Sequence, residues 1–395
     1  MIRYLTAGES HGPQIDAIVD GVPAGLALSA EDINRELFRR QQGYGAGGRM
    51  SIEKDRVKIS AGRMNGLTTG APIALTVSNR DWRNWRERDV KPMTTPRPGH
   101  ADLTGAIKYG YRELRLSLER ASARETTMRV AVGAICRRLL AEFGIVIGGY
   151  ITRIGAVDLE LADEWPVDHE ARFRDAEAND VRCPDEGVAA RMHEEIRQAI
   201  IDKDTLGGIM ELVALNVPPG LGSYVQHDRR LDARIVGAMV GIHAMKGAEI
   251  GSAFENSSRR GTQVHDEITL AEDGDSLTRR SNRAGGIEGG ISTGEPIVAR
   301  VAMKPISTVL RGFASINLAS GEAEATTYER SDFCALPRAV PVGEAVLSIV
   351  LADALLEKLG GDSVGEMRPR LESLRRARLS DLPMDDVSWR LGYED

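Results

Sequence analysis

The order of the apolar runs is the feature that most limits how this 395-residue chain can fold. Short β-like runs and helix-like stretches follow one another irregularly, without the repeating strand–helix pattern of a doubly wound parallel sheet. Residues 2–7 and 14–19 read as two strands joined by a short polar loop. Further strands are expected at residues 57–61, 71–77, 145–154, 208–217 and 296–303. The pattern predicts an α+β fold with antiparallel sheets.

Helical spacing of apolar residues predicts helices between these strands. Ser29 is typical of an N-terminal cap, with Ile33 and Leu37 following at helical spacing. A long helix is expected over 120–143, because its apolar residues form one stripe and Gly144 follows. The remaining helices are expected at 184–202, which is amphipathic and exposed, and at 231–245 and 342–359, which are apolar enough to be buried.

The chain reads as one structural unit rather than as separate domains. Its length is sufficient for a large buried core. We expect one unit over 1–360, in which the acidic segment 155–207 is a surface insertion, and a charged, peripheral tail over 361–395.

Cysteine usage and hydropathy indicate a cytoplasmic protein. Cys136, Cys183 and Cys334 are an odd number of cysteines without metal-ligand spacing, which fits a reducing compartment. The first ten residues lack the basic-then-apolar layout of a signal peptide. The apolar stretch 342–359 carries three acidic residues, too many for a comfortable membrane span.

The charge distribution favours a localised site for small anions. The formal net charge is −7, so a general affinity for nucleic acid is not expected. Arginines are concentrated in residues 39–129, whereas residues 158–195 are strongly acidic. A basic segment inside an acidic protein suits a small anionic ligand better than a nucleic-acid surface.

Two histidines stand in polar, glycine-rich segments: GESHG (8–12) contains His11 and RPGHAD (97–102) contains His100. Glycines let the backbone approach a ligand closely, and Arg97 adds an anion-binding fork. Because imidazole gains and loses protons near neutral pH, the pair indicates proton transfer around an anionic substrate. His243 is expected as a satisfied core histidine on the helix 231–245. The other histidines are expected in exposed segments without a role: His169, His193, His227 and His265.

Further segments supply candidate anion contacts. Residues 39–49 form a glycine loop bracketed by arginines, which can cradle phosphate or be a flexible connection with solvated arginines. Residues 120–126 place two arginines at the expected start of the long helix, where they need either a bound anion or neighbouring Glu119 and Glu125. Three more segments are typical of ordinary turns when taken alone: 285–290, 304–308 and 330–332.

Together these segments predict a site with many arginines, two imidazoles and a carboxylate. Such a site suits a substrate or cofactor that bears phosphate and carboxylate groups. No set of His, Cys and carboxylate residues has metal-ligand spacing, so no metal is expected. No nucleophile elbow or Ser-His-Asp order is evident.

The same segments resemble the signature segments of the chorismate synthase family. GESHGPQIDAIVDGVP (8–23) resembles the first signature, and ERASARETTMRVAVGAI (119–135) resembles the second. RPGHAD with the following KYG (108–110) resembles the substrate segment. KPIST (304–308) and RSDFCALPRAVPVGEAV (330–346) follow in order and resemble the C-terminal signatures. The resemblance runs from Ile2 to Leu359.

The resemblance implies a reaction, a cofactor and an assembly. In that family, a carbon–oxygen lyase removes phosphate and one ring proton from 5-enolpyruvylshikimate 3-phosphate by anti-1,4-elimination. The product is chorismate, at the last common step of the shikimate pathway to the aromatic amino acids. Reduced FMN is required without net redox change, and NADPH is an indirect reductant in some members. The resemblance also implies a homotetramer, and long buried helices sandwiched between antiparallel sheets in one compact unit.

The resemblance also implies roles residue by residue. His11 matches the histidine that protonates the departing phosphate, His100 the one that protonates the N1 side of reduced flavin, and Asp332 the aspartate linked to proton removal assisted by flavin N5. Hydroxyls in the same network are Ser10 and Ser122. Substrate-binding arginines are Arg40, Arg49, Arg97 and Arg124. Flavin-contacting residues are Arg120, Ala121, Ser122, His243, Ala244, Gly289, Lys304, Pro305, Ile306, Ser307, Thr308 and Arg330.

Two positions depart from the family pattern. Ala46 stands where an arginine associated with substrate or nicotinamide contact is usual, and Phe333 follows Asp332 where proline is common. Two other functions are alternatives to the lyase: a non-catalytic protein that binds a phosphorylated ligand, and an NADPH-dependent flavin reductase. Both histidines together with Asp332 favour the lyase over the binding protein, and no sequence feature points to the reductase.

Overall fold

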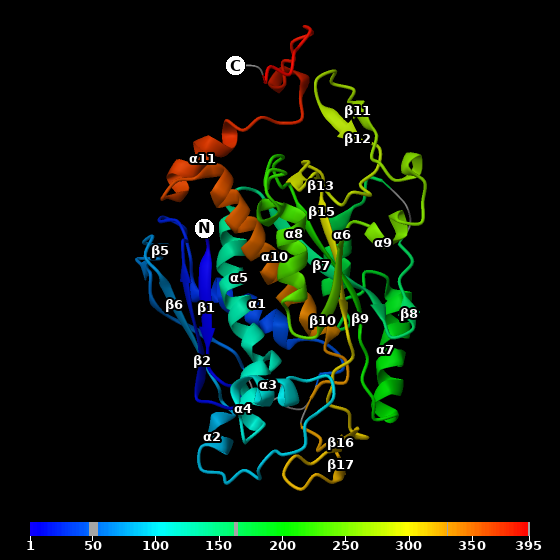
Figure 1. Cartoon of the computed structure of the whole chain (residues 1–395). Helices are drawn as coiled ribbons and strands as arrows, with labels where there is room; N and C mark the ends of the chain where they lie inside the picture. Colours follow the sequence, from blue (N-terminus) through cyan, green and yellow to red (C-terminus); the bar gives the residue numbers. More distant parts are fainter. Residues whose placement is uncertain (47–53, 162–164, 330, 394–395) are drawn as a thin grey trace.

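Both main sheets are antiparallel, as the irregular order of elements predicts. The computed structural model describes residues 1–46, 54–161, 165–329 and 331–393 (Figure 1). The four-stranded sheet has the order β1 (Arg3–Ala7), β2 (Gln14–Asp20), β6 (Ile73–Ser78), β3 (Val57–Ala61). The five-stranded sheet has the order β10 (Met245–Ile250), β15 (Ile297–Met303), β9 (Gly208–Leu215), β7 (Val146–Ile154), β8 (Val157–Asp158).

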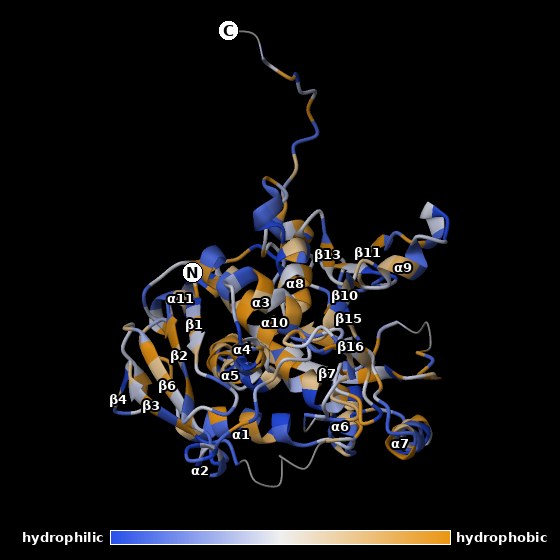
Figure 2. Ribbon diagram, turned by 60° about the horizontal axis from the view of Figure 1, so that its bottom comes forward, coloured by the Kyte–Doolittle hydropathy of each residue, from blue (hydrophilic) through white to orange (hydrophobic). Residues whose placement is uncertain are grey.

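Three helices lie between these two sheets (Figure 2): α1 (Ala30–Gln41), α5 (Thr126–Ala141) and α10 (Leu336–Leu359). α5 packs against both other helices and touches β1, β2 and β6 of one sheet and β7 of the other, and α10 touches β7 and β9. A fourth helix, α8 (Leu231–Val240), packs against α10 and β10. The predicted α+β sandwich with long buried helices is confirmed.

The start of α1 shows how local sequence sets an element. The Ser29 hydroxyl accepts a hydrogen bond from the Asp32 N–H, and the Asp32 carboxylate accepts one from the Ser29 N–H, which is a capping box. Ile33 and Leu37 then face the core and are fully buried. The helix therefore begins where its sequence predicts. Its start determines the position of Arg40, which lies in its last turn.

α10 is the one helix in the described chain that is long and apolar enough to cross a membrane, and 78% of its apolar window is buried inside the protein. It begins at Leu336, six residues before the predicted start at Val342. Pro337 lies in its first turn, where a missing N–H costs nothing. The early start matters because it carries Arg338 to the end of the sandwich.

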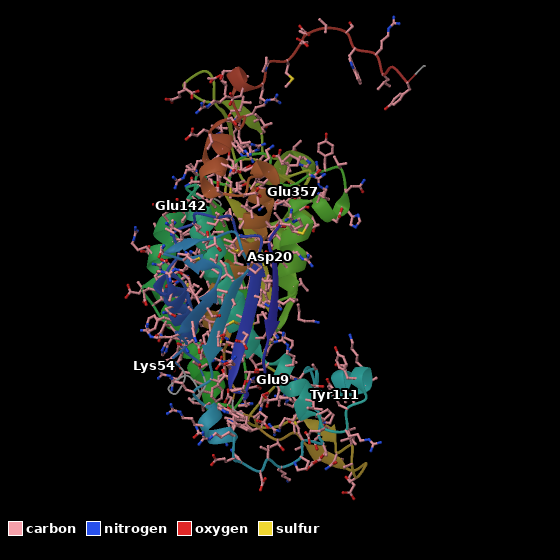
Figure 3. The ribbon with its side chains drawn as sticks, turned by 90° about the vertical axis from the view of Figure 1, so that its left-hand side faces the viewer. Glu9, Asp20, Lys54, Tyr111, Glu142 and Glu357 are labelled. Carbon is pink, nitrogen blue, oxygen red and sulfur yellow. The ribbon has the colours of Figure 1, made fainter. Side chains whose placement is uncertain are left out.

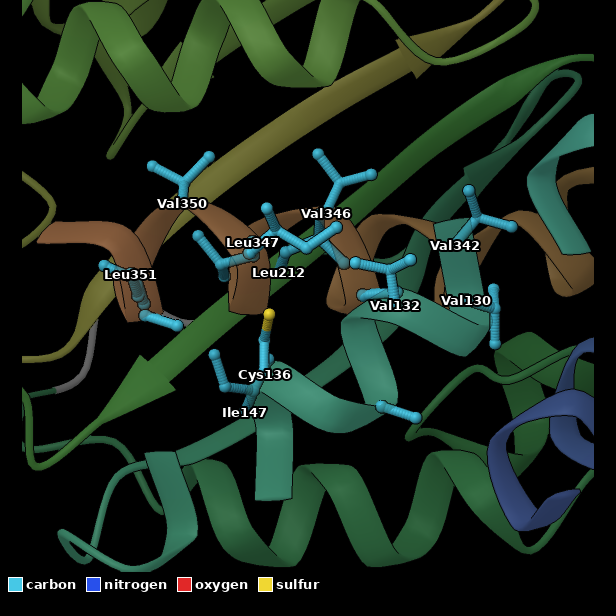
Figure 4. Close-up of a cluster of buried hydrophobic side chains, with 14 of the residues drawn as sticks. Val130, Val132, Cys136, Ile147, Leu212, Val342, Val346, Leu347, Val350 and Leu351 are labelled. Carbon is cyan, nitrogen blue, oxygen red and sulfur yellow. The ribbon is translucent and has the colours of Figure 1, made fainter. Parts of the chain in front are cut away.

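The helices α5 and α10 cross in close contact in the core (Figure 4). A Cβ added at Gly133 would lie 2.4 Å from the Ala345 Cβ and 2.5 Å from its Cα. Side chains such as Val132, Cys136 and Val346 surround this crossing and are buried. Glycine at this position is therefore a packing requirement of the helix pair rather than a helix-stop signal.

We expect Gly133→Ala to lower the free energy of unfolding by about 1–3 kcal/mol, because the added methyl has to push α5 and α10 apart. Urea denaturation measures the change. The control is Gly237→Ala in α8, where nothing lies within 4 Å of the new Cβ; it should be neutral or stabilising by up to about 1 kcal/mol. Equal midpoints for the two variants would contradict the packing argument.

Shorter elements cover the ends and the outer faces of the sandwich. The helices are α2 (Trp82–Trp85), α3 (Asp102–Tyr109), α4 (Arg115–Ala121), α6 (His169–Glu177), α7 (Glu186–Ile201), α9 (Ala253–Asn256) and α11 (Val364–Glu372). The small hairpins are β4 (Arg63–Met64) with β5 (Leu67–Thr68), β11 (Ile268–Leu270) with β12 (Leu277–Arg279), β13 (Ile287–Glu288) with β14 (Ile291–Ser292), and β16 (Ala314–Ile316) with β17 (Ala323–Ala325). Short 3₁₀ turns are η2 (Ala123–Glu125), η3 (His227–Arg229), η4 (Gly261–Gln263) and η5 (Leu379–Asp381).

The single helix predicted over 120–143 is wrong. α4 ends at Ala121, Ser122 is extended with φ −66° and ψ 142°, and η2 leads into α5. The reason is local: the Ser122 hydroxyl accepts a hydrogen bond from the Arg124 N–H at 3.3 Å, which replaces the helical pattern. At the break, the Ser122 hydroxyl also donates a hydrogen bond to the Ser10 hydroxyl at 3.1 Å.

The helix predicted over 231–245 is too long. α8 ends at Val240, and Met245 begins β10, which pairs with β15. Ala244 takes a left-handed conformation at φ 66°, which the strand entry imposes. His243 therefore lies in a connection and not on an apolar helix.

The two peripheral segments are more integrated than predicted. In the acidic segment 155–207, Met192 and Ile196 of α7 belong to the main core, and α6 packs on β7. His169, predicted to be exposed, is only 4% exposed, because it begins α6 against the sheet. Burial lowers its pKa to about 4, so the ring is neutral at physiological pH. Met367 in α11 is fully buried, so the peripheral tail starts later than predicted.

Candidate functional site

A cavity of about 470 Å³ lies at one end of the sandwich, where loops from both halves meet. In Figure 3 this end carries Glu9 of the β1–β2 loop and Tyr111 between α3 and α4, whereas Glu142 and Glu357 lie toward the opposite end. The size is in the range of small-molecule sites. Its walls come from the β1–β2 loop, α2, the 97–101 loop, the α4–η2 break, the α8–β10 connection, the segment after β15, and the start of α10.

His11 is held at the cavity wall by a carboxylate and an indole. Its Nδ1 is 2.8 Å from Glu119 Oε1, and its backbone N–H donates to Glu119 Oε2 at 2.8 Å. The Trp85 ring lies 4.1 Å from the imidazole, centroid to centroid. Burial alone would raise the pKa of Glu119, but hydrogen bonds from His11 outweigh it and the pKa is lowered. Glu119 is therefore ionised, and Nδ1 is the imidazole atom that carries a proton toward it.

His100 is held by a second carboxylate. Its Nδ1 is 2.6 Å from Oδ1 of Asp102, a fully buried residue that also receives Nε and Nη2 of Arg97 at 2.8 and 3.0 Å. Burial opposes the charge, yet the hydrogen bonds from His100 and Arg97 keep the pKa of Asp102 well below its usual range. Arg97 also donates to the Thr308 hydroxyl at 3.1 Å. One carboxylate thus fixes both the imidazole and the guanidinium.

Three more arginines line the cavity, of which Arg40 and Arg124 are buried and Arg338 is partly exposed. Arg124 donates to Asp55 at 2.8 Å, Arg40 is 3.9 Å from the same carboxylate, and Arg338 donates to Asp332 at 2.6 Å. Burial, together with Arg338 and Arg124, lowers the pKa of Arg40 to about 9. Its charge is therefore held at an energetic cost, which an anion in the cavity would relieve.

The remaining wall mixes apolar and polar groups. Leu118, Ala121, Ala244 and Ile306 supply the apolar part. The buried Nδ1 of His243 has no hydrogen-bond partner among the described residues; the nearest carboxylate oxygen, from Glu125, is 3.8 Å away. Burial lowers the pKa of His243.

Most of the predicted site residues line this cavity: Ser10, His11, Arg40, Arg97, His100, Ala121, Ser122, Arg124, His243, Ala244, Lys304, Ile306, Ser307, Thr308 and Asp332. Three others do not line it in this chain. Arg120 donates to the Thr6 carbonyl and hydroxyl on β1. Gly289 lies in the β13–β14 hairpin, and Pro305 is exposed although its neighbours Lys304 and Ile306 line the cavity. Arg49 and Arg330 lie outside the described residues.

Several wall residues were not predicted. The cavity is also lined by Trp85, Glu329, Ala335 and Arg338. Three carboxylates bind lining residues: Glu119 contacts His11, Asp102 contacts Arg97, and Asp55 contacts Arg124. The negative partner of Arg124 is Asp55, not the neighbouring Glu119 or Glu125. Proximity in the sequence could have revealed only Asp102, which follows His100 by two positions. Glu119 is 108 residues from His11, so no local pattern indicates this pair.

The chain is similar to known proteins over nearly its whole length. A family model described as chorismate synthase matches residues 2–356. The chain is 53% identical over 392 residues to a chorismate synthase of Desulforudis audaxviator, covering 96% of this chain and 99% of that one. It is 51% identical over 385 residues to one of Aquifex aeolicus, covering 94% and 96%. A crystal structure of chorismate synthase matches with a TM-score of 0.78 at 44% identity, covering 94% of this chain and 96% of that one.

Proposed function

Since the chain belongs to the chorismate synthase family, we propose that this cavity is where it converts 5-enolpyruvylshikimate 3-phosphate to chorismate. The chain is a carbon–oxygen lyase of the route to aromatic compounds, with a small-molecule substrate. The substrate carries one phosphate and two carboxylates. The single observation that supports the location best is the group of three buried arginines, Arg40, Arg97 and Arg124, around one cavity.

The cavity also suits a reduced flavin, the cofactor type that the family uses. The apolar wall formed by Leu118, Ala121 and Ile306 fits a flat ring, and His243 is a further lining residue. We propose FMN as the flavin, held also by Ser122, Lys304 and Thr308. When bound, reduced flavin supplies electron density to an electron-poor carbon without net oxidation.

The chain's own residues would handle the protons and charges of the elimination. As the C–O bond to phosphate breaks, His11 donates a proton from Nε2 to the departing oxygen, because Nδ1 is committed to Glu119. Arg40 and Arg124 stabilise the negative charge that builds up there. Asp332, held by Arg338, is the carboxylate for the ring proton that leaves the substrate. His100 presents its Nε2 on the flavin side while Asp102 fixes Nδ1.

The function is tested by incubating the enzyme with photoreduced FMN and 5-enolpyruvylshikimate 3-phosphate without oxygen or NADPH. Formation of chorismate, followed by its absorbance, together with an equal amount of phosphate is the expected result. Binding of substrate without phosphate release would instead indicate a non-catalytic binding protein. In a second assay with oxidised FMN, turnover that begins when NADPH is added would indicate a reductase step within the chain.

We expect Arg40→Met to raise the KM for substrate by about 10–100-fold, the value of one lost charge-assisted contact. At the same time the ligand-free variant should melt no lower than the wild type, because the depressed pKa of Arg40 means that its charge costs stability at neutral pH. Steady-state kinetics and a thermal melt measure the two effects. Arg35→Met, on the exposed face of α1, is the control and should change neither. A large drop in melting temperature with an unchanged KM would mean that Arg40 is structural.

Assembly and location remain part of the proposal. We propose a homotetramer in the cytoplasm, because the family forms tetramers and the three cysteines are all unpaired and buried. Gly289 and Arg120 lie outside the cavity of this chain, so any contact from them to flavin would need a neighbouring subunit. Light scattering that gives a mass close to one chain for the active enzyme would contradict the tetramer.

A further inference from the structure

We infer that Glu119 is the positioning residue of His11: it fixes both the loop that carries the imidazole and the nitrogen that the imidazole presents. This inference rests on the proposed role of His11 as the acid. Glu119 does not line the cavity, so it acts on the reaction only through the histidine.

Three hydrogen bonds dock the β1–β2 loop on Glu119. Its backbone carbonyl accepts the Ser10 N–H at 3.1 Å, and its carboxylate accepts the backbone N–H and the Nδ1 of His11, one on each oxygen, both at 2.8 Å. Both groups that face the carboxylate are donors. Glutamine has one acceptor oxygen and one NH₂ group, so it can keep both contacts only if its NH₂ donates to an unprotonated Nδ1. The imidazole could then no longer carry a proton on both nitrogens, which the carboxylate of Glu119 allows.

The loop itself supplies little that would fix the ring without Glu119. Gly8 and Gly12 flank it, and Gly8 has φ +108°, a conformation that other residues rarely adopt. Asn79 holds the loop through the carbonyls of Glu9 and Gly12, so these hydrogen bonds fix the backbone and not the His11 ring. The Trp85 ring contacts the imidazole at an interplanar angle of 35°, and the imidazole could make this contact with either nitrogen toward Glu119. The carboxylate is therefore the group that selects Nε2 for the cavity.

Glu119 also differs from the carboxylate that holds the second histidine. Asp102 shares its charge between His100 and a bidentate Arg97. The nearest guanidinium to the Glu119 carboxylate is that of Arg115, whose Nη1 is 3.9 Å from Oε1. The side-chain hydrogen bonds of Glu119 therefore go to His11, and Glu119 and His11 form a dyad.

The test is a double-mutant cycle with Glu119→Gln and His11→Ala. Glu119→Gln alone should lower kcat by about 10–100-fold, with the KM for substrate and the binding of reduced FMN changed less than about twofold. In the His11→Ala background the same substitution should change kcat by less than about twofold, because the group it positions is gone. Effects that multiply in the double variant would overturn the inference. Glu119→Asp, which keeps both oxygens but falls one methylene short, should have an intermediate kcat, and it replaces the glutamine variant in the cycle if that one does not fold.

A matched control and a structural readout separate positioning from general damage. Glu113→Gln removes a carboxylate that also accepts two backbone N–H groups, from Met93 and Arg115, but does not line the cavity, and it should keep kcat. A crystal structure of Glu119→Ala, which lacks both side-chain oxygens, should show the His11 ring displaced or turned over; an unmoved ring would refute the inference. If His11→Ala itself keeps full turnover, the proposed role of His11 fails, and the crystal structure still decides whether Glu119 orients the ring.

Discussion

His11→Ala is expected to lower kcat by about 10²–10⁴-fold under saturating reduced FMN, with little change in the stability of the fold. Phosphate is a poor leaving group when its oxygen departs without a proton, and one positioned general acid is worth about that factor. His11 is the imidazole whose Nδ1 is fixed by Glu119 and whose ring packs on Trp85, so its removal leaves no equivalent donor on that wall among the described residues. Anaerobic single-turnover measurements of phosphate release report the effect on the chemical step.

The matched control for His11→Ala is His227→Ala, because His227 is exposed in η3 and far from the cavity walls. It should keep full turnover. We expect His100→Ala to lose activity of the same order as His11→Ala, since Asp102 and Arg97 are arranged around that ring. If neither histidine variant of the site falls by tenfold, the acid roles assigned to both are wrong.

Most strands and buried helices could be predicted from the sequence, because these elements depend on local periodicity. The alternation of apolar residues in β2 and the capping box at Ser29 are both properties of neighbouring residues. The helix break at Ser122 escaped prediction because an apolar stripe continues past it. What decides there is one hydroxyl that competes with the helical hydrogen bonds.

The candidate site divides in the same way. Its imidazoles and most of its arginines stand in recognisable glycine-rich motifs, so their gathering in one cavity followed from the motifs. The carboxylates that orient these residues could not be predicted from the motifs. Glu119 and Asp55 are far in sequence from His11 and Arg124, and only the fold brings them into contact. Arg338 was missed for another reason: the helix was predicted to begin at Val342, and only the early start of α10 brings Arg338 to Asp332.

The second large effect is expected in the core, at a buried carboxylate on α10. Glu344 is 1% exposed and accepts hydrogen bonds from Arg39 at 2.6 and 3.0 Å and from Arg137 at 2.8 Å. These two arginines come from α1 and α5, so the network ties together all three helices of the sandwich. Breaking one partner of a buried ionic network costs about 3–5 kcal/mol, because the remaining charges stay buried. We therefore expect Glu344→Gln to lower the free energy of unfolding by about that amount at neutral pH.

The pH dependence of this loss distinguishes the charge from simple packing. Burial opposes ionisation of Glu344, but Arg39 and Arg137 outweigh it and lower its pKa from 4.5 to about 2 in the folded protein. A carboxyl group with a depressed folded-state pKa stabilises the fold above its unfolded pKa and loses that contribution as pH falls toward the folded value. The stability difference between wild type and Glu344→Gln should thus shrink by about 3 kcal/mol between pH 4.5 and pH 2. Urea denaturation at several pH values measures it, with Glu357→Gln, on the exposed side of the same helix, expected to stay within about 1 kcal/mol of wild type. A difference that stays constant across this pH range would show that Glu344 supports the helices by shape and not by charge.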